Sequence, residues 1–187
     1  MAAPFHTTLS TVAKPPVTND TRHGSILVGG IALDNTYAGF TLGKITNNER
    51  EYPGYGFTVA YNGGHQGEAT LYVYNKGQAN IGDGPLSSAV LSEFNQATRE
   101  VLSLGGRADR KIELVARYGT GSPERGKEFL CAEFILSDGF GSRRTFVYIT
   151  GVGENFLKIR VTLRTNDEAN PMARNFADAV AAGLRWK

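Results

Sequence analysis

The side chain most suited to covalent chemistry in this sequence is a single cysteine, Cys131. It would act as a nucleophile if a histidine lay beside it in space, as in cysteine hydrolases. However, it stands inside the apolar run 129–136, with no loop, helix N-terminus or local base to lower the pKa of the thiol. We therefore expect a buried and unreactive thiol.

The three histidines, His6, His23 and His65, are far apart in the sequence. None stands at an i, i+2 or i, i+4 spacing from another histidine or from the cysteine, which is the usual pattern of a local metal site. One cysteine also excludes multi-cysteine metal sites and a disulfide within the chain. The sequence predicts no metal ligands and no cofactor, and only His65, in the glycine-rich turn 62–67, merits a test.

Two glutamates in β-rich runs, Glu113 and Glu133, could form a paired acid and base if their strands aligned. Glu133 stands out because the run around it is otherwise apolar on both faces. We favour a structural ion pair between Glu133 and either Lys158 or Arg160 on a neighbouring strand. The alternative is a small hydrolase that uses Glu133 or Glu113 together with His65.

Basic side chains gather in two late β-rich runs and the turn before one of them. They are Arg143, Arg144, Lys158, Arg160 and Arg164. Strict alternation over residues 156–164 places the last three on one strand face, opposite an apolar face. If no carboxylate pairs with these cations, they form a patch that would bind an acidic partner or an anionic ligand. A solvated face with internal salt bridges is the other interpretation.

Tyrosines concentrate in one predicted hairpin and the segment that leads into it. They are Tyr52, Tyr55, Tyr61, Tyr72 and Tyr74. Exposed tyrosines favour contacts with proteins or glycans, whereas packing under a helix would account for some of the five. We predict a partner-binding surface built from Tyr52, Tyr55, Tyr72 and Tyr74 or from the five basic residues named above.

The composition is that of an ordinary folded domain, with 187 residues, 41% of them hydrophobic and 20% charged. The formal net charge of +2 is too even to drive strong binding to nucleic acid or anionic lipid by itself, so any recognition of anions must be local. No stretch approaches the roughly 20 apolar residues that cross a bilayer. A single hydrophobic core is expected.

Residues 1–23 are polar and rich in threonine and proline, which predicts a flexible arm before a single α+β domain at 24–187. The first residues show neither the basic nor the apolar region of a signal peptide. Small residues and a proline after Met1 would also suit a mature exported protein whose signal peptide was replaced by methionine. The protein would then be periplasmic or secreted, and otherwise cytoplasmic.

The elements that must position these residues are mostly strands. The pattern predicts an antiparallel sheet of about six to eight strands with two amphipathic helices packed on it. One helix is expected at 86–104, before the stop signal Gly105-Gly106, and the other after Asn170-Pro171. A turn at 34–36 is expected to join the first two strands, and residues 129–136 to form a central strand covered on both faces.

The order of hairpin, helix, meander of long strands and C-terminal helix, with the turn Tyr52-Pro53-Gly54 before a central strand, resembles the PsbP-like α/β/α sandwich. The resemblance spans about residues 40–186. It implies a non-enzymatic accessory or binding domain, and no set of functional residues carries over from it. We therefore expect a domain that contacts a protein or another macromolecule.

Overall fold

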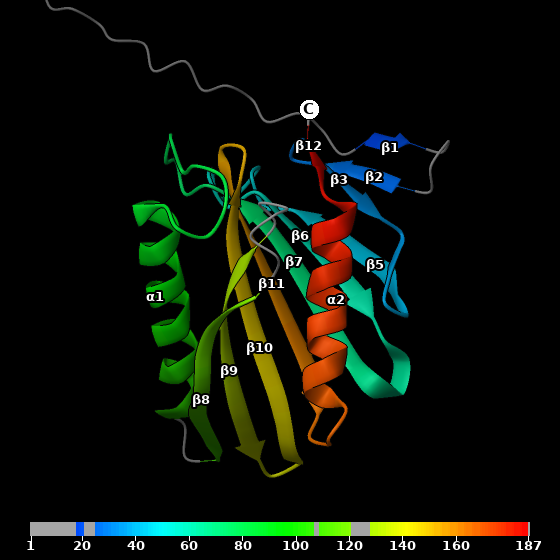
Figure 1. The fold of residues 1–187 in the computed structure, drawn as a ribbon, viewed down its shortest axis with the longest axis vertical. Coiled ribbons are helices and arrows are strands. Elements are labelled where there is room, and N and C mark those ends of the chain that lie inside the picture. Colours follow the sequence, from blue (N-terminus) through cyan, green and yellow to red (C-terminus); the bar gives the residue numbers. More distant parts are fainter. Residues whose placement is uncertain (1–17, 21–24, 107–108, 121–127, 187) are drawn as a thin grey trace, which may run out of the picture.

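A computed structural model describes residues 18–20, 25–106, 109–120 and 128–186. Its centre is an eight-stranded, fully antiparallel sheet (Figure 1) in the order β4-β5-β6-β7-β11-β10-β9-β8. The strands are β4 (Thr36–Tyr37), β5 (Phe40–Asn47), β6 (Phe57–Asn62), β7 (Gly67–Tyr74), β8 (Arg110–Thr120), β9 (Phe129–Asp138), β10 (Gly141–Val152) and β11 (Asn155–Arg164). The predicted α+β class and strand number are confirmed.

Strands β8 to β11 form the meander that their short connections predict. The last of them, β11, then pairs with β7, which joins the meander to the β5-β6-β7 segment. As a result β11 lies in the middle of the sheet. Strand β9, which we expected to be central, is second from the edge, although it is covered on both faces because α1 and α2 pack on opposite sides.

Each helix covers one face of the sheet. Helix α1 (Ser88–Ser103) packs its buried side chains, such as Val90 and Phe94, over Ala132, Phe134 and Val147 of the sheet. Helix α2 (Ala169–Gly183) covers the other face together with the small sheet. Because strand residues alternate between faces, neighbouring positions on β9 and β10 belong to different cores. The α/β/α layering that the pattern predicted is confirmed.

The helix boundaries follow local chemistry. Helix α1 begins after Ser87, whose hydroxyl accepts a hydrogen bond from the Val90 amide at 3.2 Å, so Pro85 precedes the helix instead of lying in its first turn. Helix α2 buries Phe176, Val180 and four alanines, and Phe176 makes edge-on ring contacts with Tyr37, Phe40 and Tyr61. The apolar face of this predicted amphipathic helix is therefore largely buried.

A second sheet shows that the expectation of one hairpin across residues 34–36 was wrong. Its strands are β1 (Thr18–Asp20), β2 (Ser25–Val28), β3 (Ile31–Asp34) and β12 (Arg185–Trp186). The run 25–33 is itself a hairpin, because Gly29 and Gly30 both adopt positive φ, as a tight two-residue turn requires. Part of the predicted arm, β1, pairs with β2, and the rest of residues 1–23 lies outside the described residues.

Within the residues that the structure describes, neither helix is long and apolar enough to cross a membrane.

Candidate functional site

The candidate site lies on the α1 side of the sheet, beside the helix and not beneath it. Helix α1 packs over β8 and β10. The same face of β6, β7 and β11 extends beyond the helix and is open to solvent in three depressions, two of which share lining residues. Their walls contain eight of the nine residues that the sequence put forward for partner binding.

The first depression, which we call the tyrosine groove, holds about 580 Å³. It is lined by Asn48, Tyr52, Tyr55, Thr58, Tyr72, Tyr74, Lys76, Gln96, Glu100 and Lys158. The four predicted tyrosines thus share one groove with one of the predicted cations. Tyr52 and Tyr55 are 61% and 58% exposed, and their rings meet edge to face at 6.0 Å between centres. Tyr61 does not belong to this surface, because it is buried on the α2 side and donates a hydrogen bond to the Asp34 carbonyl.

The loop that carries the two exposed tyrosines is fixed by one carboxylate. Glu49 accepts hydrogen bonds from the amides of Gly54 and Gly56, each at 2.9 Å. Gly56 has φ +57°, and a Cβ there would lie 1.8 Å from the Val73 carbonyl oxygen. The loop therefore packs directly on β7 where only glycine fits. Sequence reasoning missed Glu49, which reads as one more charge in a polar run.

Lys158 occupies the floor of the groove. Its Nζ atom lies 4.7 Å from the centre of the Tyr72 ring and 5.2 Å from that of the Tyr74 ring, which is the range of cation–π contacts. Burial lowers the pKa of this ammonium, and the charges of Glu93 and Glu100 oppose that effect. No carboxylate of the described residues forms a salt bridge with it.

A buried acid of α1 holds two of the residues that line the groove, Tyr74 and Lys76. Glu93 is only 3% exposed, accepts a 2.7 Å hydrogen bond from the Tyr74 hydroxyl and pairs with Lys76 at 2.7 Å. Burial and the nearby Glu93 charge both raise the pKa of the Tyr74 hydroxyl, which therefore stays a donor. We did not anticipate this network, because Glu93 falls on the expected solvent side of the helical pattern.

The second depression, the end pocket, continues from the tyrosine groove along the last turns of α1. It holds about 330 Å³ and shares Tyr72, Glu100 and Lys158 with the groove. Arg160 adds a second cation two residues along β11, on the same strand face. The Nε atom of Arg160 is buried and has no hydrogen-bond partner among the described residues.

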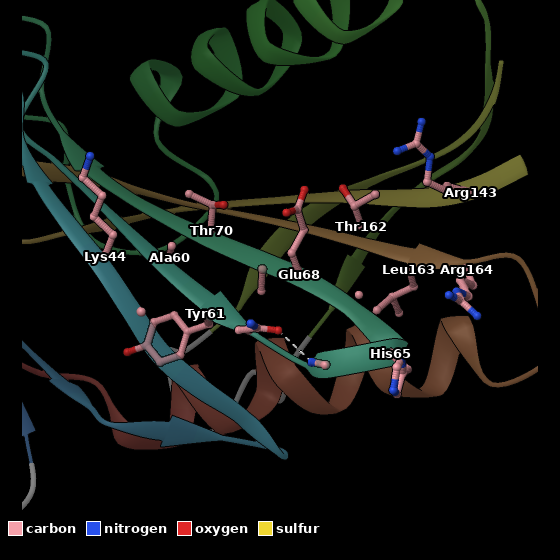
Figure 2. A pocket seen from close by; sticks show the side chains of 15 residues that line it. Lys44, Ala60, Tyr61, His65, Glu68, Thr70, Arg143, Thr162, Leu163 and Arg164 are labelled. Atoms are coloured by element: carbon pink, nitrogen blue, oxygen red, sulfur yellow. Dashed lines mark hydrogen bonds between the residues drawn. The ribbon is translucent and has the colours of Figure 1, made fainter. Parts of the chain in front are cut away.

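The third depression, the basic pocket, holds about 630 Å³ at the far end of the same face. Its charged lining residues are Lys44, His65, Glu68, Arg143 and Arg164. Figure 2 shows Lys44, Glu68 and Arg143 projecting from the sheet toward the side of α1, whereas His65 and Arg164 lie near the β6–β7 turn. Arg143 and Arg164 are direct cross-strand neighbours, and Arg143 also pairs with Asp138.

One predicted member of the basic patch lies elsewhere. Arg144 points to the α2 face, where it forms a 2.9 Å ion pair with the buried Glu133. The expected ion pair of Glu133 exists, but its partner is Arg144, and not Lys158 or Arg160 as we predicted. The reason is strand alternation, which puts Glu133 and Arg144 on one face and the two β11 cations on the other.

The residues of the hydrolase hypothesis are not brought together. His65 is exposed in the β6–β7 turn, Glu133 is buried on the α2 side of β9, and Glu113 lies on the edge strand β8 beside Lys111. Two strands, β11 and β10, separate β7 from β9, which amounts to roughly 14 Å at the usual strand spacing. Neither glutamate can therefore share a proton with His65 in this arrangement.

Cys131 lies in the core on the α2 side of β9, as the apolar run predicts. Burial raises the pKa of the thiol to about 12, with smaller opposing effects of Tyr118 and Tyr148. Over the described part of the chain no three histidine, cysteine, aspartate or glutamate side chains gather as a metal site would require.

Comparisons with known proteins concern the fold alone. No protein-family model and no curated protein sequence matches this chain. The solution structure of cyanobacterial PsbP from Synechocystis sp. PCC 6803 is similar to it, with 12% sequence identity, coverage of 92% of either chain and a TM-score of 0.49. The order of elements predicted a resemblance to the PsbP-like proteins, and this match transfers no function.

Proposed function

We propose that this chain is a non-enzymatic binding domain that contacts a macromolecule along the open α1-side face of its sheet. The observation that carries the proposal is the position of Lys158, which lies in both the tyrosine groove and the end pocket. Because Lys158 lines both depressions, the exposed Tyr52 and Tyr55 and the cation Arg160 belong to one continuous surface. Tyrosine and arginine are the residue types that contribute most to binding energy at protein surfaces.

The charge of this surface points to an anionic partner. Lys158, Arg160 and Arg164 form no salt bridge with any described carboxylate, and the Lys158 ammonium lies against two tyrosine rings. Glu68 and Glu100 are the acidic residues in the lining of the three depressions. An acidic partner would therefore gain charge–charge attraction while its apolar parts lie on the tyrosines.

The proposal is tested by capture of a partner on the immobilised full-length chain. A variant that combines Arg160→Glu, Arg164→Glu and Tyr55→Ala should lose the material that the unchanged chain retains from lysate of its own host. Lys111→Glu, on the exposed edge strand β8, is the matched control and should retain it. Protein, carbohydrate and nucleic acid are each measured in the eluate. Equal capture by the triple variant and the unchanged chain would contradict the proposal.

A further inference from the structure

The tyrosine groove has the size of a small-ligand site, since pockets of about 300–1,000 Å³ are typical of such sites. Its outer wall is the pair Tyr52 and Tyr55 on the loop held by Glu49, and Tyr72 lies beside Lys158 on its floor. The faces of aromatic rings carry partial negative charge and attract C–H groups. A saturated ring with an apolar C–H face would fit between this wall and α1.

Beside the hydroxyl groups of its tyrosines, the groove offers a ligand several hydrogen-bond acceptors. The Asn48 amide donates to the Thr58 hydroxyl at 3.0 Å, and the Gln96 amide donates to Glu100 at 2.9 Å. Both bonds use amide N–H groups, which leaves the carbonyl oxygens of Asn48 and Gln96 and the second carboxylate oxygen of Glu100. Acceptors of this kind suit a ligand that presents several O–H donors.

Lys158 imposes one further requirement. Its ammonium carries three N–H donors, lies against two tyrosine rings and has no acceptor among the described residues. A partly buried cation without an acceptor is best matched by a carboxylate or another anionic group. The ligand therefore combines an apolar ring face, hydroxyl donors and a negative charge. A DNA strand fits less well, because its sugar–phosphate backbone offers no hydroxyl donors to the carbonyl oxygens of Asn48 and Gln96.

We propose that the tyrosine groove binds a uronic acid unit of an acidic glycan, with the ring against Tyr52 and Tyr55 and the carboxylate on Lys158. This inference rests on the proposed function and specifies the chemistry of its partner. The end pocket and the basic pocket would then hold further carboxylates of the same glycan on Arg160 and Arg164, along the same strand.

Binding should depend on pH through Lys158. A bound carboxylate favours the protonated amine, so affinity should be highest when the amine of the free protein is protonated and should fall as pH rises above its lowered pKa. Other charged or titratable groups act on this amine from α1, β7, the following loop and β11. They are Glu93, Glu100, Tyr72, Tyr74, Lys76 and Arg160. These groups act on the amine in the same way whichever sugar is added. A neutral sugar has no carboxylate that responds to the charge of Lys158, so its binding should depend much less on pH.

The test is a calorimetric titration of the full chain with α-1,4-linked trigalacturonate, with maltotriose as its neutral counterpart. Trigalacturonate should bind at least tenfold more tightly than maltotriose. Lys158→Gln should weaken its binding about tenfold or more, and Lys158→Arg, which keeps the charge, should restore most of the loss. The pair Tyr52→Ala and Tyr55→Ala should weaken binding of both sugars. Lys111→Gln is the control, and thermal unfolding checks that each variant is folded.

Several outcomes would overturn the inference. They are equal affinity for the neutral sugar, an unchanged affinity in Lys158→Gln, and no binding of trigalacturonate. Hexathymidylate and hexaglutamate are titrated in parallel. If either binds through Lys158 and the tyrosines while trigalacturonate does not, the glycan assignment is wrong and the proposed binding face stands. The proposed function itself is tested separately by the capture experiment.

Discussion

The Nζ atom of Lys158 lies 4.7 Å from the centre of the Tyr72 ring. This contact joins a cation of the central strand β11 to a tyrosine of β7. Both residues line the tyrosine groove together with Tyr52 and Tyr55 of the loop before β6. It also fixes the place where the tyrosine groove meets the end pocket. The account of this protein as a binding domain depends on that junction.

Lys158 should titrate below an ordinary lysine, because burial disfavours its charged form. The measurement is an NMR titration of ¹³C-methylated lysines, with the Lys158 signal assigned by its loss in Lys158→Arg. A signal that titrates with the other lysines would contradict the burial argument.

The same lowered pKa makes stability depend on pH. Between the folded-state pKa of Lys158 and its ordinary value of 10.5, the unfolded chain binds more protons than the folded one. The contribution of this residue to the free energy of unfolding should therefore rise with pH through that window. Lys158→Met removes the titrating group. The free energy of unfolding is measured with urea at each pH for this variant and for the unchanged chain, and the difference between the two isolates the contribution of Lys158. A difference that falls with pH would show that the sign is wrong.

Arg144→Ala should destabilise the fold without affecting the proposed surface. The substitution leaves the carboxylate of Glu133 buried without its cation, which typically costs about 3–5 kcal/mol, and the partial exposure of Arg144 reduces this to about 2–3 kcal/mol. Arg164→Ala removes an exposed cation and should change the free energy of unfolding by about 0.5 kcal/mol or less. Urea unfolding compares the two variants. Equal losses would mean that Arg144 has no special role in the core.

Glu49→Ala should loosen the wall of the tyrosine groove. The substitution removes the acceptor of the Gly54 and Gly56 amides, and hydrogen bonds to a charged acceptor contribute about 1.5–3 kcal/mol each. Amide hydrogen exchange at these glycines should become at least tenfold faster. Glu51→Ala, in the same polar run but exposed, should leave the exchange unchanged. Unaltered protection in Glu49→Ala would show that packing on β7 alone holds the loop.

Cys131 should report global unfolding. Because burial raises the pKa of the thiol to about 12, it should not react with Ellman's reagent at pH 8 in the folded chain. In urea the rate of reaction should follow the unfolded fraction measured by circular dichroism. Rapid stoichiometric reaction in the absence of urea would place the thiol at the surface.

The parts of the fold that sequence predicted well are those governed by regular alternation. The run at β11 placed apolar and basic side chains on opposite faces, and the stripe of α2 identified the residues that now contact the sheet. The buried thiol of Cys131 followed from the same pattern. These inferences need only local periodicity, which burial on one or both faces directly imposes on the sequence.

The errors arose where pairing between distant segments decides the outcome. Glu133 can pair only with a cation on its own face of the sheet. The registers of β9, β10 and β11 decide which cation that is, and the sequence of a single strand does not reveal them. The turn at 34–36 was expected to join the first two strands, but β2 and β3 already pair across the Gly29-Gly30 turn, and β3 pairs with β12 in a separate sheet. The meeting of Tyr52, Tyr72 and Lys158 required the pairing of β7 with β11, which are more than 80 residues apart in the sequence.

The central claim is that the partner lies on the α1-side face of the sheet, and site-specific photo-cross-linking tests it most directly. A photoreactive amino acid is placed at Tyr55 or Arg164 and, as the control, at Lys111 on the exposed edge strand β8. The account predicts one common adduct from the first two positions in cells that express the chain, and little of it from the third. An adduct formed equally well from Lys111, or from Lys111 alone, would contradict it.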